Sequence, residues 1–254
     1  MLAVLAALLS TGPTVVSLTA QSRLPKLGAY ASPELRGALI LWSKAVEAFV
    51  AGGESKPTRM ETWFEEIDAK GAVVTREESR LALSYVPGKE EPVTSIEYTA
   101  KDGKDVTLER RKKAAEDAAK GRNAARRPGG ESSFSATPLD PDQQVNVTLL
   151  SSRQGFRDGK AILSVEYEQV EGKNSYAGIL HLDASTGFPL EAEYGFKKAP
   201  VFVNFMRTNL VYGQRASQGL MAAVVASVGF EAEGTLLVIK KRFRGKLRFL
   251  DYAN

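Results

Sequence analysis

The sequence of 254 residues contains no cysteine and a single histidine, His181. The lack of cysteine excludes disulfides, thiolate nucleophiles, cysteine-ligated zinc sites and a lipid-modified cysteine. His181 has no second histidine with which to share a metal, so we interpret it as a structural or surface residue. No Gly-rich phosphate loop, HExxH motif or nucleophile elbow occurs either. We therefore expect no catalytic residues, no metal and no cofactor.

The excess of positive charge is small. A net charge of +4 and a pI near 9.1 fall short of the clustered basic excess of a nucleic-acid-binding domain, so we expect no nucleic-acid partner. The 43% hydrophobic and 25% charged residues are ordinary for a globular protein. The length allows one large β domain or two small ones, and we expect a single domain over residues 21–254.

The first twenty residues carry no charge. An apolar core over residues 2–9, a Gly12-Pro13 break and small residues up to Ala20 are typical of a secretory signal peptide. No lysine or arginine precedes the apolar core, and a buried N-terminal helix remains the alternative. We predict a signal peptide over residues 1–20, cleavage near Ala20, and export as a soluble periplasmic protein.

One amphipathic helix opens the predicted domain. Ser32-Pro33-Glu34 provides a hydroxyl cap, a proline in the first turn and an acidic residue near the positive end of the helix dipole. Apolar residues then recur at helical spacing up to Phe49, and Gly52-Gly53 ends the helix. From Thr58 the apolar period changes to two, which indicates strands.

Residues 105–133 form a charged segment. Its periodic apolar residues are Leu108 and several alanines, surrounded by lysine and arginine, so a helix here packs weakly. We predict a surface helix to about Arg122 that runs into a loop.

After residue 140 the chain reads as strands only. Seven runs of β pattern are separated by short turns such as Arg157-Asp-Gly-Lys160, which force antiparallel pairing. With the earlier runs, they predict ten to eleven strands, and a sheet that wide must curl. The predicted fold class is α+β: a large curved antiparallel sheet, an unclosed barrel, with one or two helices covering its concave face.

The last strand carries a basic ladder, which we define as the cations at its even positions: Lys240, Arg242, Arg244, Lys246 and Arg248. Even positions share one face of a strand. The ladder could dock on anionic lipid headgroups or an acidic partner. The alternative is a solvated outer face, charged against edge-to-edge aggregation and neutralised by carboxylates on neighbouring strands.

The strands before it are apolar on both faces. Phe205 and Met206 lie on opposite faces of one run, as do Val224 and Val225 of the next. A sheet with one solvated face would alternate with polar residues, so both faces are covered here. Packing beneath a helix and the lining of an apolar cavity remain alternative explanations.

Glu61 and Glu65 share one face of an early strand with Trp63. Nothing distinguishes a proton donor from an acceptor, so we interpret them as sheet surface. An esterase or glycosidase remains an alternative function, although the sequence contains no recognisable set of catalytic residues.

The run Tyr176-Ala-Gly-Ile-Leu-His-Leu-Asp-Ala-Ser-Thr-Gly-Phe-Pro-Leu190 resembles a recurring hairpin of the periplasmic outer-membrane lipoprotein-carrier superfamily (LolA/LolB-like). The resemblance implies an unclosed barrel whose concave apolar face, covered by helices, holds acyl chains. The charged segment at 105–133, the basic last strand and the missing lipobox cysteine depart from the classical carriers.

Two hypotheses follow. The first is a non-enzymatic periplasmic carrier of lipid or lipoprotein acyl chains, whose cavity is lined by Trp42, Phe49, Phe205, Met206, Val224 and Val225. The second is a structural or interaction protein of the bacterial envelope that docks on an envelope protein or an anionic membrane through the basic ladder. A monomer is expected in both cases.

Overall fold

The structure is a computed structural model that describes residues 24–29, 31–53, 55–86, 92–119, 137–201, 203–217, 220–236 and 239–253. The predicted signal peptide over 1–20 lies outside these residues. The helices are α2 (Pro33–Gly52), α3 (Thr107–Ala119) and the 3-10 helix η1 (Pro141–Asn146). The strands are β1 (Lys26–Leu27), β2 (Lys56–Ile67), β3 (Val73–Ser84), β4 (Val93–Lys101), β5 (Lys104–Asp105), β6 (Val147–Arg157), β7 (Lys160–Glu171), β8 (Asn174–Asp183), β9 (Pro189–Phe196), β10 (Val203–Ser217), β11 (Leu220–Leu236) and β12 (Ile239–Ala253).

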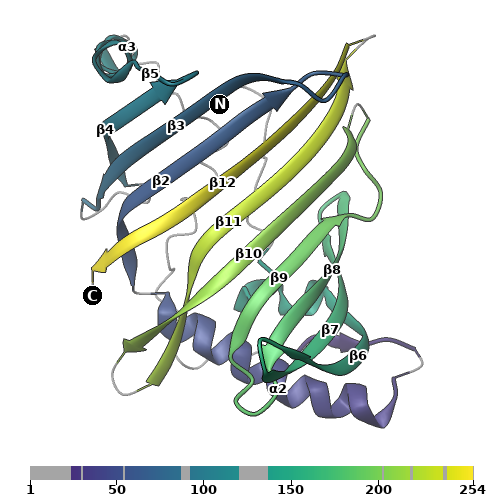
Figure 1. Cartoon of the computed structure of the whole chain (residues 1–254). Helices are drawn as coiled ribbons and strands as arrows, with labels where there is room; N and C mark the ends of the chain where they lie inside the picture. Colours follow the sequence, from purple (N-terminus) through teal and green to yellow (C-terminus); the bar gives the residue numbers. More distant parts are fainter. Residues whose placement is uncertain are drawn as a thin grey trace.

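All of these strands belong to one curved, unclosed sheet in the order β1-β6-β7-β8-β9-β10-β11-β12-β2-β3-β4-β5 (Figure 1). This confirms the predicted fold class. The sheet has twelve strands instead of ten or eleven, because β1 and β5 are two-residue strands too short to leave a pattern. Pairing is antiparallel except where β1 runs parallel to β6.

Two hairpin turns contain an Asp-Gly pair, and one of them is the turn predicted at Arg157-Asp-Gly-Lys160. Asp102 and Gly103 have φ of 51° and 79°, and Asp158 and Gly159 have φ of 50° and 76°. Positive φ at both central residues is the type I′ turn, whose twist matches that of the flanking strands. These turns hold β4 against β5 and β6 against β7.

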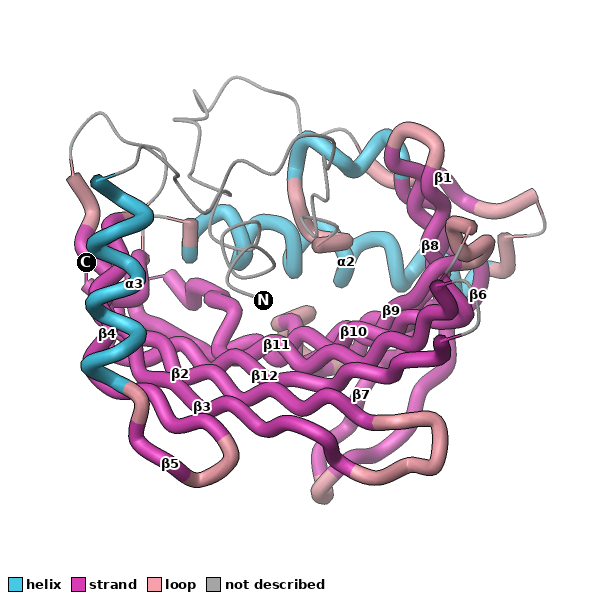
Figure 2. Tube along the Cα trace, turned by 90° about the horizontal axis from the view of Figure 1, so that it is seen from above, coloured by secondary structure: helices cyan, strands magenta, loops and turns pink. Residues whose placement is uncertain are grey.

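Helix α2 lies on the concave side of the sheet (Figure 2). Ser32 caps it by accepting a hydrogen bond from the Leu35 N–H. Its apolar stripe is buried and packs against β6 and β8–β11. At its end, a Cβ on Gly52 would lie 2.0 Å from the Ala223 carbonyl oxygen, so only glycine allows this close approach to β11.

Helix α3 packs against β4 at the edge of the sheet (Figure 2). The Arg111 guanidinium donates to the carbonyls of Ile96 and Glu97 at 2.8 and 3.0 Å, and the Arg110 Nη2 lies 2.6 Å from Glu77. α3 begins within the predicted charged segment, and residues 120–133 of that segment lie outside the described chain. The helix protects an edge that would otherwise offer unpaired backbone groups.

Candidate functional site: the two faces of the sheet

The concave face is recognised by its contacts with α2. The Trp42 and Tyr167 rings meet edge to face with centroids 5.6 Å apart, and those of Phe49 and Tyr212 are 6.3 Å apart. Trp42 is fully buried, and its indole N–H donates to the Gln144 Oε1 at 2.8 Å. α2 is thereby fixed to η1 as well as to the sheet.

The six residues predicted to line the cavity divide between two faces. Met206 belongs to the buried core beside α2, and Val225 lies opposite Tyr212 and packs against the same core. Phe205 points the other way, with the Arg242 guanidinium 5.7 Å from its ring centroid. Val224 lies opposite Gly213, on the other face from Val225. The structure therefore brings Trp42, Phe49, Met206 and Val225 together on the concave side and directs Phe205 and Val224 away from them, because strand side chains alternate.

An aromatic cluster that the sequence reasoning missed lies on the concave face where β11, β12 and β2 run side by side. The Phe64 ring stacks on Phe243 at 5.7 Å and lies 6.3 Å from Phe230. Gly245 leaves room for the Phe230 ring, since a Cβ at Gly245 would be 2.6 Å from that ring. The sequence did contain a signal for this cluster. Phe64, Phe230 and Phe243 all occupy inward positions of their strands, and Gly245 is the next inward position of β12 after Phe243.

The apolar concave face continues beyond α2. Met60, Leu81, Leu83, Leu247 and Phe249 of β2, β3 and β12 are buried members of the same core. The main contacts of α2 are with β11 and β6, and with β8–β10 to a lesser extent. The apolar surface of the sheet is thus wider than the area against which α2 packs.

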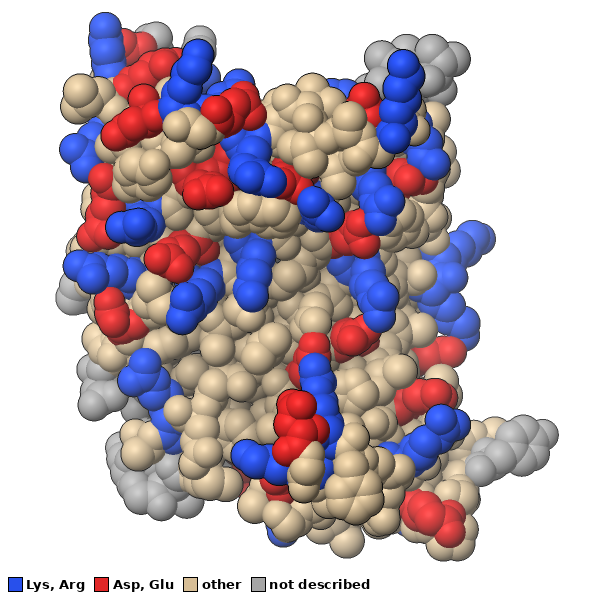
Figure 3. Space-filling view, in the orientation of Figure 1, with Lys and Arg blue, Asp and Glu red and all other residues tan. Residues whose placement is uncertain are grey.

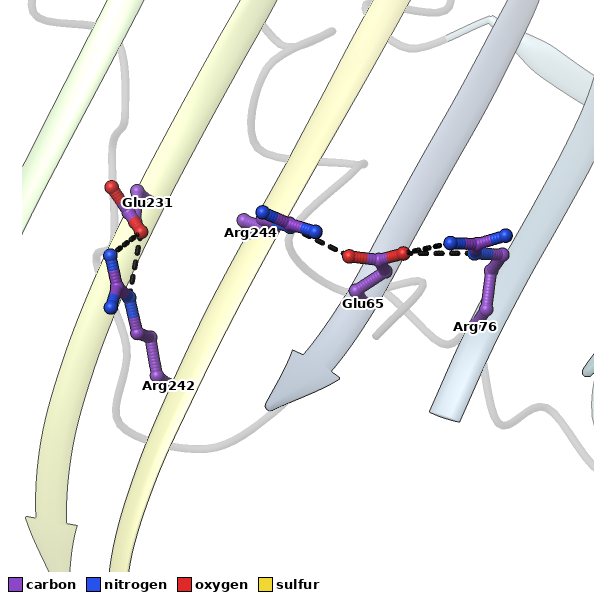
Figure 4. Close-up of polar contacts among 5 residues, drawn as sticks. All are labelled: Glu65, Arg76, Glu231, Arg242 and Arg244. Carbon is purple, nitrogen blue, oxygen red and sulfur yellow. Dashed lines mark hydrogen bonds and ion pairs between the residues drawn. The ribbon is translucent and has the colours of Figure 1, made fainter. Parts of the chain in front are cut away.

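The convex face holds the basic ladder among carboxylates of the neighbouring strands (Figure 4). The Arg244 Nε donates to the Glu65 Oε2 at 2.6 Å, and the Arg76 Nη2 donates to the Oε1 at 2.6 Å. Burial alone would raise the pKa of Glu65, but hydrogen bonds and charge from Arg76 and Arg244 outweigh it, so the pKa is lowered. The Glu65 side chain has no exposed area because its two arginines cover it.

Other members of the ladder are paired in the same way. Arg242 forms an ion pair with Glu231, Lys240 lies 2.8 Å from Glu233, and Arg248 lies 3.8 Å from Glu61. Lys246 has no ion pair with any described residue, and its strand neighbours are Gly229 and Trp63. Figure 3 shows basic and acidic side chains intermixed over this face. The ladder is therefore exposed but largely neutralised.

Groups that could carry chemistry are held in structural contacts. The His181 Nδ1 lies 2.9 Å from the Ser164 hydroxyl, and Glu191 accepts from Arg157 and Asn209. Glu61, the other carboxylate of the β2 pair, lies 3.9 Å from Arg80. Within the described ranges, no three histidine or acidic side chains gather as metal ligands.

No protein-family model matches the chain. A search of curated proteins also finds no match. Among solved structures, a crystal structure of MucB in complex with MucA(peri) is 11% identical, covers 83% of this chain and 92% of its own, and has a TM-score of 0.23. A complex structure of Pseudomonas aeruginosa MucA/MucB is 11% identical, with 84% and 94% covered and a TM-score of 0.24. Similarity this low supports no conclusion about function, and the resemblance to the lipoprotein carriers stays a prediction.

In the part of the chain that the structure describes, no helix has both the length and the apolar character needed to span a membrane.

Proposed function

We propose that the protein is a non-enzymatic periplasmic carrier that binds the acyl chains of a lipid or lipoprotein against the concave face of its sheet. The observation that carries the proposal is the width of the apolar concave face. Buried and half-buried apolar side chains extend from β6 to β3, whereas α2 packs mainly against β11 and β6. The Phe64, Phe230 and Phe243 cluster lies in this additional area.

Acyl chains suit such a surface because burial of CH₂ groups needs no specific polar partner. Each buried CH₂ contributes about 0.8 kcal/mol. Ten of them would supply roughly 8 kcal/mol, which corresponds to a Kd on the order of 1 μM before ordering costs. Residues 1–20, interpreted as a signal peptide, support a periplasmic location.

The second candidate, an envelope interaction protein, would use the basic ladder. Its exposure on one face favours docking, while its pairing with Glu231, Glu233 and Glu65 leaves little net charge for an anionic partner. We therefore place the carrier first.

The test compares two phenylalanines on opposite faces. Phe243→Glu places a charge on the concave face, and Phe205→Glu places the same charge on the convex face as the matched control. The full chain, purified from bacterial cells, is examined by native mass spectrometry for co-purifying lipid and by binding of a fluorescent fatty-acid probe. Circular dichroism checks that both variants fold.

We expect lipid and probe binding in the wild type and in Phe205→Glu, and a loss of at least tenfold in Phe243→Glu. A wild-type protein that carries no lipid and binds no probe would refute the carrier function. Equal loss in both variants would place the binding surface elsewhere.

A further inference from the structure

Three tyrosines of the concave face lie beneath α2, on strands that are near neighbours in the sheet. Tyr167 of β7, Tyr194 of β9 and Tyr212 of β10 are 1%, 4% and 6% exposed. A Cβ on Gly178 would be 2.7 Å from the Tyr167 hydroxyl, so that hydroxyl lies over Gly178. Gly178 is paired directly with Tyr194 in β9. The Tyr167 hydroxyl thus extends across β8 toward Tyr194.

One polar group of this cluster has a partner within the protein: the Tyr212 hydroxyl lies 3.2 Å from that of Thr137. Thr208 lies directly opposite Tyr194, yet among the described residues neither of these two hydroxyls has a hydrogen-bond partner. Two side chains of β7 are unpaired as well. Among the described residues, neither the Tyr167 hydroxyl nor either amide atom of Gln169 has a hydrogen-bond partner.

Gln169 follows Tyr167 by two positions on β7, so both side chains point from the same face. Gln169 is 1% exposed. Buried polar side chains in folded proteins nearly always have a partner, so each exception calls for an explanation. Two such exceptions side by side in an apolar interior indicate a place where a ligand supplies the missing hydrogen bonds.

The surroundings select an uncharged ligand group. The strand neighbours of Tyr167 and Gln169 are Leu149, Gly178, Val147 and Tyr176, which are all neutral. Burial raises the pKa of Tyr167 well above its usual value, so its hydroxyl stays a neutral donor. Burial, and to a smaller extent the charge of Glu171, raises the pKa of Tyr194, so these surroundings disfavour an anion.

We propose that Tyr167 and Gln169 form a polar anchor in the concave face, which hydrogen-bonds the carbonyl of an uncharged acyl ester or amide. The phenol O–H and the amide N–H donate to the carbonyl oxygen, and the amide oxygen accepts from a neighbouring hydroxyl or N–H of the ligand. This inference rests on the proposed function and deepens it, because it names the chemical class of the group to which the acyl chain is attached.

The experiment uses two ligands that differ by the carbonyl alone, 1-palmitoylglycerol and 1-O-hexadecylglycerol. Their affinities for the full chain are measured below their micelle concentrations, by displacement of the neutral probe N-phenyl-1-naphthylamine. The proteins are the wild type, Tyr167→Phe, Gln169→Leu and the control Tyr98→Phe. Tyr98 lies opposite Arg80 of β3, whose guanidinium is 5.6 Å from its ring, on the convex face.

We expect the wild type and Tyr98→Phe to bind the ester about tenfold more tightly than the ether. Tyr167→Phe and Gln169→Leu should each remove most of that preference while leaving the affinity for the ether unchanged. Palmitate, a carboxylate, should bind the wild type more weakly than the ester does.

Equal binding of ester and ether by the wild type would overturn the anchor and leave the carrier function standing. Absence of binding by both would overturn the carrier function as well. Unfolding of ligand-free protein gives a further check: because the Tyr167 hydroxyl has no protein partner, Tyr167→Phe should unfold at the same or a higher urea concentration. A clearly lower midpoint would assign that hydroxyl a structural role and overturn the inference.

Discussion

Arg244 of β12 donates to the carboxylate of Glu65 in β2 at 2.6 Å, although 179 positions separate them in the chain. The other oxygen of the same carboxylate accepts two hydrogen bonds from Arg76 of β3, at 2.6 and 2.8 Å. One carboxylate therefore ties the last strand of the chain to two of its first. This link lies inside the unclosed sheet, where β12 and β2 are neighbours although they are far apart in the sequence.

Glu65→Gln is expected to destabilise the fold, because it leaves two guanidinium groups beside each other without a counter-charge. Glu61→Gln is the matched control on the same face of β2. Glu61 is 41% exposed, and its arginines are 3.8 and 3.9 Å away. Urea unfolding should show a clear fall in the midpoint for Glu65→Gln and little change for Glu61→Gln.

The pH dependence of that effect has a definite sign. The pKa of Glu65 is lowered in the fold, so its stabilisation is present above the pKa of the unfolded chain and is lost as the pH falls through the folded value. The difference between wild type and Glu65→Gln should therefore shrink in acid. A difference that grows in acid would contradict the ion-pair assignment.

Local patterns were enough to predict the longer strands and their turns, but not the two-residue strands β1 and β5. Asp158-Gly159 marks a two-residue hairpin, and the alternation of cations in β12 places them on one face. The residues that lie opposite these cations on the neighbouring strands could not be predicted from the sequence. The pairing of Arg244 with Glu65 depends on β12 closing against β2, a long-range contact with no local signature.

Gly245→Ala should destabilise the protein by about 1–3 kcal/mol, because the added methyl group would lie 2.6 Å from the Phe230 ring and 3.0 Å from the Trp63 carbonyl oxygen. The control is Gly229→Ala in β11, where the nearest heavy atom would be 3.8 Å away. We expect the control to be neutral or slightly stabilising, by up to about 1 kcal/mol. Chemical denaturation measures both, and equal losses would contradict the close packing of Phe230 on Gly245.

The inward direction of the site was harder to predict than its location. α2 and the apolar strands were found from spacing, yet Phe205 and Met206 are equally apolar and only one faces α2. Tyr167 and Gln169 alternate with Glu166 and Glu168, so the sequence does place them on the inward side of β7. Their lack of hydrogen-bond partners depends on the neighbouring strands and could not be predicted.

Asp183→Asn tests the turn that carries the family resemblance. The Asp183 Oδ1 accepts from the hydroxyls of Ser185 and Thr186 and from both their backbone N–H groups. The Ser185 hydroxyl and the Thr186 N–H lead the effects that lower its pKa from 3.8 to about 2. The folded pKa lies below the unfolded one, so the stabilisation exists above about pH 4 and disappears toward pH 2.

We expect Asp183→Asn to lower the free energy of unfolding at pH 7 by about 1 kcal/mol, a value reduced for solvent screening of this accessible turn. The gap between wild type and variant should close between pH 4 and pH 2, as followed by urea unfolding at each pH. Glu116→Gln on exposed α3 serves as the surface control. A gap independent of pH would contradict the charged turn.

The neutralised ladder predicts weak membrane association. Four of its five cations have a carboxylate within 4 Å, so vesicles rich in phosphatidylglycerol should retain no more protein than zwitterionic vesicles do. Lys246→Glu, which breaks no ion pair among the described residues, should change nothing in a co-sedimentation assay. Salt-sensitive binding that Lys246→Glu weakens, and that Lys240→Glu, Arg242→Glu and Arg244→Glu together abolish, would favour the docking function instead.

Because Trp42 attaches α2 to η1, we expect its substitution to cost more stability than the substitution of Trp63. Trp42→Phe removes the donor to the Gln144 Oε1 and leaves that buried oxygen unsatisfied, so we expect a loss of about 2 kcal/mol. Trp63→Phe is the control, because Trp63 is half-buried on the convex face with the Arg244 guanidinium 5.5 Å from its ring. Each variant keeps the other tryptophan as the reporter of urea unfolding. Because the bond joins α2 to η1, its loss should also increase hydrogen exchange of α2 amides, and equal effects of the two substitutions would argue that the indole–Gln144 bond does not hold the helix over the concave face.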